Sequence, residues 1–312
     1  MITCTDNVCI LMGLSMVCLK TVNAHLYRGK IGRLVEEANG CVAAIRERAD
    51  RRELRLMRRY FLQTDAIFYF TLIIAVALVV GFVILVPVEL KYPFDVSDPW
   101  NRSLVLGFQA FVVTVDVLAT DMLDNLFSRI YASIVLRLQI LNLRFEDCAV
   151  GGGLAARLEA CVRRHQGVLR SVAEVNEVYS GIGCMQFVVV SVINCIALFQ
   201  MFLNVGRNPN FLKFGAYYGG SLFYICCYCW ISDRITHQSS LVIDSQWMAG
   251  WERDPSPTVK SLMIFSAMVA NKPLTMKIWR FGDFSLATAI NTLRISYSAY
   301  TLLTRVHEND EP

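Results

Sequence analysis

The chain has 312 residues, a net charge of +4 and a mean hydropathy of +0.44, with 55% hydrophobic and only 18% charged residues. Soluble globular proteins are less hydrophobic and carry about 25% charged residues. The composition therefore excludes an ordinary soluble protein and favours a membrane domain. The sequence has no P-loop, nucleophile-elbow or Gly-rich dinucleotide motif, so it indicates no enzyme, no cofactor, no metal and no nucleic-acid partner.

Long apolar runs predict an all-α, polytopic membrane protein with six spans. A helix needs about 20 residues to cross a hydrocarbon core of about 30 Å. The predicted spans lie near residues 8–22, 66–88, 103–127, 178–206, 214–232 and 284–304. Two of them are irregular, because one contains Asp116, Asp121 and Asp124 and the last contains Arg294.

Basic residues alternate between crowded and sparse segments along the chain. Eleven Lys and Arg lie between Lys20 and Arg59, two between Lys91 and Arg102, and seven between Arg129 and Arg170. The positive-inside rule places the first, third and fifth loops in the cytoplasm. Both termini, including the tail at 306–312, are therefore expected outside.

Two further features concern the outer side of the membrane. Asn101 begins the sequon Asn-Arg-Ser and lies in a predicted outer loop, which makes it a candidate glycosylation site. Residues 8–19 have the length of a signal-peptide core. Asp6, rather than a positive charge, precedes that segment, so a first span is favoured over a signal peptide.

Several helices are predicted to extend beyond the membrane. Residues 103–147 contain no Pro and a single Gly, and at about 1.5 Å per residue they allow a helix of about 67 Å. A second, antiparallel helix starts near Leu154, and residues 258–276 supply a short helix and a turn. We expect these extensions to form a cytoplasmic anchor bundle; the alternative is that they lie on the membrane surface.

Polar groups inside the spans are the candidate functional residues. Asp116 is such a candidate, whereas Asp121 and Asp124 are expected in the interfacial zone near the cytoplasm. His165 is expected on the polar face of its helix. The sequence "CCYC" at 226–229 lies mid-span without a nearby His, which favours apolar packing over metal binding.

The last span carries two polar stripes at helical spacing. One stripe contains Ala289, Thr292, Ser296, Tyr300 and Leu303, and the other contains Thr288, Asn291, Arg294 and Ser298. One stripe can line a water-filled pathway while the other contacts neighbouring helices. The alternative is that both stripes only hold a helix bundle together.

The segment "ANKPLTMKIWRFGDFSLATAINTLRISYSAYTLL" resembles the C-terminal signature of insect odorant receptors. The shared features are a Lys-Pro-Leu turn, a Ser-Leu helix start and a Ser-Tyr-Ser close before the final Leu pair. The segments "YPFDVSDPW", "LRLQILNLRFED" and "IDSQWMAGW" agree as well. The resemblance runs from about Cys18 to Leu303.

This resemblance implies an odorant-gated cation channel of the plasma membrane, found in sensory neuron dendrites. Four subunits surround one pore in such a channel, and one kind of subunit is a shared olfactory co-receptor. The family has seven spans with a cytoplasmic N-terminus, so this chain is expected to lack the first span. Its short loop between the third and fourth predicted spans implies a ligand-tuning subunit rather than the co-receptor.

The resemblance also implies domains and site residues. Residues 1–257 would form the ligand-binding bundle, 258–276 the anchor helix and turn, and 277–305 the pore-lining helix. The pore residues carried over are Thr292, Ser296, Tyr300 and Leu303. The expected odorant pocket lies in the outer halves of the spans and involves Phe82, Phe108, Phe111, Tyr217, Tyr218 and Leu222.

Three alternative functions are weighed against this one. A gustatory-type receptor channel would have the same architecture, but "SYSAYTLL" fits the odorant branch better. A G-protein-coupled receptor would need a seventh span that ends inside, and the chain lacks Asp-Arg-Tyr and Asn-Pro-x-x-Tyr motifs. A transporter would show internal symmetry or paired interrupted helices, which the sequence does not contain.

Overall fold

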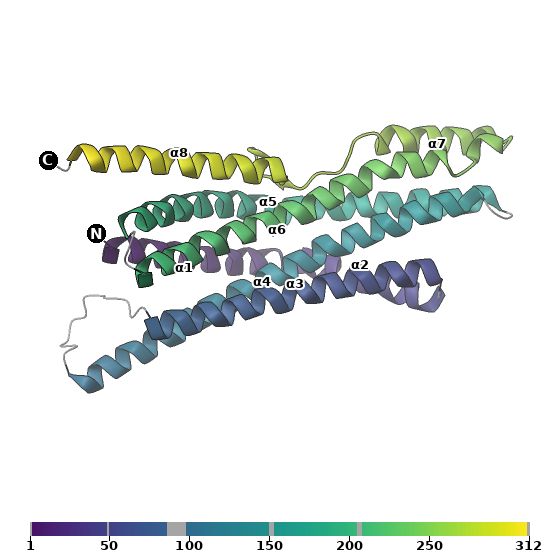
Figure 1. The fold of residues 1–312 in the computed structure, drawn as a ribbon. Helices are drawn as coiled ribbons and strands as arrows, with labels where there is room; N and C mark the ends of the chain where they lie inside the picture. The colour runs from purple at the N-terminus through teal and green to yellow at the C-terminus, as the bar shows by residue number, and fades with distance from the viewer. Residues whose placement is uncertain (1, 49, 86–97, 150–152, 205–207, 311–312) are drawn as a thin grey trace.

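The computed structural model describes residues 2–48, 50–85, 98–149, 153–204 and 208–310. These residues form eight α-helices, two short 3-10 helices and one two-stranded hairpin (Figure 1). The elements in chain order are α1 (Ile2–Leu26), α2 (Arg28–Arg48), α3 (Arg51–Leu85), α4 (Pro99–Glu146), η1 (Asp147–Ala149), α5 (Leu154–Leu203), α6 (Asn208–Trp247), η2 (Trp251–Arg253), α7 (Pro257–Ala270), β1 (Lys277–Ile278), β2 (Gly282–Asp283) and α8 (Leu286–Asp310).

The long helices run along one common axis, and both termini lie at the same end of the bundle (Figure 1). Helices α2 and α7 lie at the opposite end. Three described helices are long and apolar enough to cross a membrane, namely Arg51–Ala77 within α3, Pro99–Glu146 and Leu154–Leu203. The all-helical membrane fold is therefore confirmed, whereas the number of six spans stays a prediction.

Helices α4 and α5 are much longer than a membrane is thick. They contain 48 and 50 residues, which at about 1.5 Å per residue gives about 72 and 75 Å. The second half of α4 packs against the first half of α5, at the end of the bundle opposite the termini (Figure 1). The side chains in this contact are almost fully buried and include Leu138, Phe145, Leu158 and Val175. The predicted extension of these two helices beyond the membrane thickness is confirmed, although its cytoplasmic placement stays a prediction.

The far end of the bundle also contains a buried ion pair between α3 and α4. Glu53 and Arg144 are joined by two hydrogen bonds, Nε–Oε1 at 2.5 Å and Nη2–Oε2 at 3.0 Å. Their side chains are only 5% and 14% exposed. Such a two-pronged contact fixes the guanidinium plane. It therefore fixes the relative position of α3 and α4 where both leave the predicted membrane zone.

His165 is a correction to the sequence analysis. Its side chain is 4% exposed in the first half of α5, not on a solvated face. Helices α2, α4, α6 and α7 all contact α5, so this helix is covered on more than one side. The loss of solvation lowers the pKa of His165, which favours the neutral imidazole.

The segment between α7 and α8 is tied to the long helices by three polar side chains. Asn176 of α5 donates to the Thr275 carbonyl at 3.0 Å and accepts from the Lys277 N–H at 2.8 Å. Ser239 of α6 accepts from the Leu274 N–H at 2.8 Å. Asp233, also on α6, accepts from the Leu286 N–H at 3.0 Å and so caps the start of α8. These hydrogen bonds hold the segment between α7 and α8 against α5 and α6.

Candidate functional site

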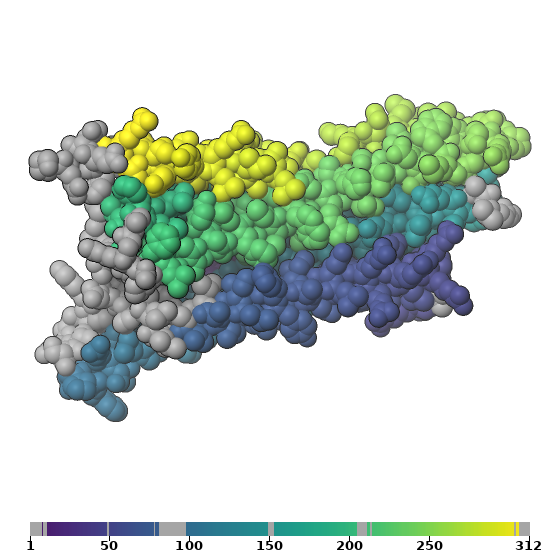
Figure 2. All heavy atoms as spheres, viewed as in Figure 1, coloured from purple at the N-terminus to yellow at the C-terminus, as the bar shows by residue number. Residues whose placement is uncertain are grey.

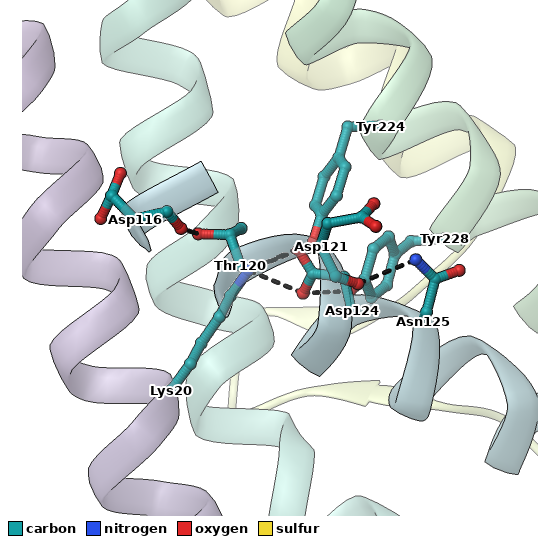
Figure 3. A network of polar contacts seen from close by, with 8 residues as sticks. All are labelled: Lys20, Asp116, Thr120, Asp121, Asp124, Asn125, Tyr224 and Tyr228. Carbon is teal, nitrogen blue, oxygen red and sulfur yellow. Dashed lines mark hydrogen bonds and ion pairs between the residues drawn. The ribbon is translucent and has the colours of Figure 1, made fainter. Parts of the chain in front are cut away.

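A buried polar network joins α1, α4 and α6, and Figure 3 shows its side chains from close by. The Lys20 ammonium lies 2.8 and 3.0 Å from the two carboxylate oxygens of Asp124 and 3.2 Å from the Tyr224 hydroxyl. The Tyr228 hydroxyl donates to Asp124 Oδ1 at 2.8 Å. Lys20 and Asp124 are each only 7% exposed. One carboxylate thus connects three helices that are far apart in sequence.

Asp121 and Asp124 lie inside the helix bundle, where they are 9% and 7% exposed. Both were predicted in the interfacial zone near the cytoplasm, and their depth in the membrane stays a prediction. Lys20 was counted with the cytoplasmic basic residues, although its ammonium is buried against Asp124. The partners are 104 residues apart, and hydropathy within one segment carries no information about such a pairing. Ionisable groups inside a membrane bundle usually pair in this way.

A cavity of about 310 Å³ lies beside the network, bounded by α1, α3, α4 and α6. Its apolar wall includes Ile67, Ile74, Ala75, Val117 and Phe223. This volume is at the lower end of the range of about 300–1,000 Å³ found for small-molecule sites. A mostly apolar wall with a few polar groups suits a small ligand that is itself mainly hydrocarbon.

A second cavity, of about 40 Å³, lies on the other side of the same network. Lys20, Phe127 and Phe284 are among its lining residues. Asp124 and Tyr228 line both cavities. These two side chains therefore form a wall that the two cavities share.

Asp121 is the most unusual polar group of the larger cavity. Its Oδ2 atom is buried and accepts no hydrogen bond from the described residues. The neighbouring Asn125 amide donates to the Asp121 backbone carbonyl at 2.8 Å and to the Thr71 hydroxyl at 3.1 Å. Most buried polar atoms in proteins have a partner. An oxygen without one, on a cavity wall, is available to a ligand.

The predicted pocket residues do not line this cavity. Phe108 and Phe111 are 65% and 66% exposed in the single chain, and their role in a pocket stays a prediction. Tyr217, Tyr218 and Leu222 are half-buried on α6, and their role stays a prediction. The side chain of Phe82 lies outside the described residues. Position along a helix does not by itself predict which face of the helix is covered.

The predicted pore stripe of α8 is partly turned inward. Thr292 and Ser296 are 7% and 1% exposed. The Ser296 hydroxyl contacts the Thr292 carbonyl at 3.0 Å and the Ser191 carbonyl of α5 at 3.3 Å. Within one chain these two hydroxyls are therefore not open to a pore. Tyr300 is half-buried, and the side chain of Leu303 lies outside the described residues.

Another side of α8 is uncovered in the single chain. Figure 2 shows this helix lying along the outside of the bundle, on top of the long helices. Asn291 and Ser298 are exposed, and Ile295 and Leu302 are 63% and 65% exposed. Their spacing places all four on one stripe, which we call the outer stripe of α8. Asn101, the candidate glycosylation site, lies half-buried in the first turn of α4, and its modification stays a prediction.

Comparison with known proteins identifies the fold. Residues 1–297 match the family described as 7tm Odorant receptor. The chain belongs to this family. Its structure is similar to that of the insect olfactory receptor OR5 from Machilis hrabei in complex with eugenol, with a TM-score of 0.81 and 16% identity over 97% of this chain and 82% of that one. The structure of the same receptor determined without a named ligand gives a TM-score of 0.79.

Proteins with similar sequences support the assignment to this family. Odorant receptor Or2 of Anopheles gambiae is 24% identical over 50% of this chain and 41% of its own length. Odorant receptor 13a of Drosophila melanogaster is 21% identical over 72% of this chain and 58% of its own length. The chain thus spans about half the length of these relatives. It is a multi-pass membrane protein of the odorant receptor family.

Proposed function

We propose that this chain is a ligand-tuning subunit of an odorant-gated cation channel in the plasma membrane, assembled with a shared co-receptor into a heterotetramer. The observation that carries the proposal is the family match over residues 1–297. A structural similarity that covers nearly the whole chain is consistent with it. The proposed role is that of a receptor and channel, not of an enzyme.

The proposed odorant site is the cavity bounded by α1, α3, α4 and α6. Its mainly apolar wall favours burial of a hydrocarbon skeleton, which contributes about 25 cal/mol per Å² of apolar surface. The polar groups of α4, which include Asp121 and Asp124, fix the orientation of the ligand. This site lies deeper in the bundle than the pocket expected from Phe108 and Phe111.

The outer stripe of α8 is the proposed pore surface, in place of Thr292 and Ser296. Asn291 and Ser298 can solvate cations, and Ile295 and Leu302 form apolar rings that close a narrow pore by dewetting. The exposure of all four in the single chain supports this assignment. The α7–α8 tethers through Asn176 provide a path by which movement of α5 reaches this helix.

Whole-cell current tests the proposal. Cells expressing this chain, the co-receptor, or both are exposed to a panel of volatiles. We expect odorant-evoked cation current only in cells that express both proteins. Evoked current in cells with the co-receptor alone, or none in any cell that carries both proteins on its surface, contradicts the tuning role.

A further inference from the structure

The cavity beside the Lys20–Asp124 pair is rich in carboxyl groups. Three carboxyl groups line it, those of Asp116, Asp121 and Asp124. No Lys, Arg or His is among the described residues that line it. Lys20, which approaches from α1, is bound to Asp124. Neither of the other two carboxyl groups forms a direct ion pair with a described residue, although the Lys20 charge also acts on Asp116.

Asp121 is the group placed to bind a ligand. Its side chain is nine-tenths buried, and its Oδ2 atom lacks a hydrogen-bond partner among the described residues. The Asn125 amide donates to the Asp121 backbone carbonyl and to the Thr71 hydroxyl. The Thr71 and Asn125 side chains also interact with the Asp121 carboxyl group, so that Oδ2 is its remaining free acceptor in the described part of the chain. An unpaired carboxylate oxygen in a low-dielectric site gains most from a charged donor.

The remaining wall suits the rest of such a ligand. Phe223, Tyr224 and Tyr228 contribute aromatic rings, and α3 contributes Ile74 and Ala75. Aromatic faces attract cations, especially where water is excluded. A small molecule with one ammonium group and a short hydrocarbon body therefore matches both the charge and the volume of the cavity.

We propose that this cavity selects small volatile amines, whose ammonium group pairs with the Asp121 carboxylate. The inference rests on the proposed function, since it names the ligand class of the same site. An alcohol of equal shape donates only one neutral hydrogen bond to Asp121 and leaves the charge of the carboxylate uncompensated. Amines should therefore bind more tightly than matched alcohols.

The test uses the purified chain in lipid nanodiscs and two matched pairs of probes. The pairs are hexylamine with hexanol, and phenethylamine with phenethyl alcohol. Binding is measured as a ligand-dependent rise in the unfolding temperature, followed by tryptophan fluorescence. We expect each amine to bind about 10- to 100-fold more tightly than its alcohol, the ratio typical of a charge-assisted contact.

The variant Asp121→Asn removes the charge and keeps the shape. We expect it to abolish the amine preference while alcohol binding changes little. Asp98→Asn at the start of α4 is the matched control, because Asp98 is exposed and lies outside the cavity. Equal binding of amine and alcohol by the wild-type chain overturns the inference, and so does an amine preference that persists in D121N. If D121N does not fold, the comparison of amine with alcohol binding by the wild-type chain still tests the inference.

Current recordings separate this inference from the proposed function. Amine-selective binding without evoked current in co-expressing cells means that the ligand class is right and the channel role is wrong. Current evoked equally by alcohols and amines means that the channel role is right and the ligand class is wrong.

Discussion

The ring of Phe284 lies directly over the bare Cα of Gly183, so close that no side chain fits between them. Phe284 precedes α8 and is 3% exposed. Its ring centroid lies 5.4 Å from that of Phe187 on α5 and 6.3 Å from that of Tyr228 on α6. This contact seats the start of α8 on α5, next to the buried polar network.

Gly183→Ala is expected to destabilise the chain. The added methyl group would overlap the Phe284 ring, which is held between two other aromatic side chains, and overpacking of this kind costs about 1–3 kcal/mol. Gly181→Ala, two residues away, meets no atom within 4 Å and is the matched control. Thermal unfolding in detergent compares the two variants. An equal unfolding temperature for both would show that the Phe284 contact does not fix α8.

Lys20→Met is expected to be strongly destabilising. It leaves the Asp124 carboxylate buried without its cation, and loss of one partner of a buried pair costs about 3–5 kcal/mol. The double variant Lys20→Met/Asp124→Leu removes both charges and should recover much of that loss. The free energy of unfolding of wild type, both single variants and the double variant gives the coupling. Additive effects would rule out the pair as the unit that joins α1 to α4.

Cysteine substitution on α8 distinguishes its two polar stripes. Ser298 is exposed on the outer stripe, whereas Ser296 is 1% exposed against α5. In cells that co-express the co-receptor, a charged thiol reagent should block the odorant-evoked current of Ser298→Cys. It should leave the current of Ser296→Cys and of wild type unchanged. Block of Ser296→Cys without block of Ser298→Cys would instead place Ser296 in the pore, as the sequence predicted.

The free energy of unfolding should fall at acidic pH because of His165 in the first half of α5. Burial lowers its pKa below the ordinary value of 6.5, so the unfolded chain binds the proton more readily than the folded chain. The contribution is fully present above pH 6.5 and is lost as the pH falls below it, by at most about 1.4 kcal/mol per unit. Unfolding curves at neutral and acidic pH measure this loss, and His165→Gln should reduce it. An equal loss in H165Q would assign the acid sensitivity to other groups.

The sequence predicted the positions of the helices along the chain better than the contacts between helices. Apolar runs located the long helices, and the absence of Pro between Ser103 and Asp147 correctly predicted an uninterrupted helix there. The burial of His165 and the pairing of Lys20 with Asp124 were missed, because each depends on which helices lie beside which. The burial of Thr292 and Ser296 in the single chain could not be predicted for the same reason, since either polar stripe of α8 could face the bundle.

The cavity itself had one visible signal in the sequence. Asp116, Asp121 and Asp124 interrupt a predicted span, and acids in such a position are functional candidates. Sequence alone could not distinguish a buried cluster from an interfacial one. The structure places all three beside aromatic residues of α6, which come about 100 residues later in the chain.

In the proposed mechanism, a volatile ligand in the cavity bounded by α1, α3, α4 and α6 gates the channel. Gly220 lines this cavity and Gly219 does not, and a Cβ at either position meets no atom within 4 Å. The decisive measurement is odorant-evoked current from Gly220→Leu and Gly219→Leu, each co-expressed with the co-receptor and matched for surface expression. We expect G220L to lose its response because its side chain fills the cavity, while G219L responds like wild type. A normal response from G220L would place the ligand elsewhere and contradict the assignment of this cavity as the odorant site.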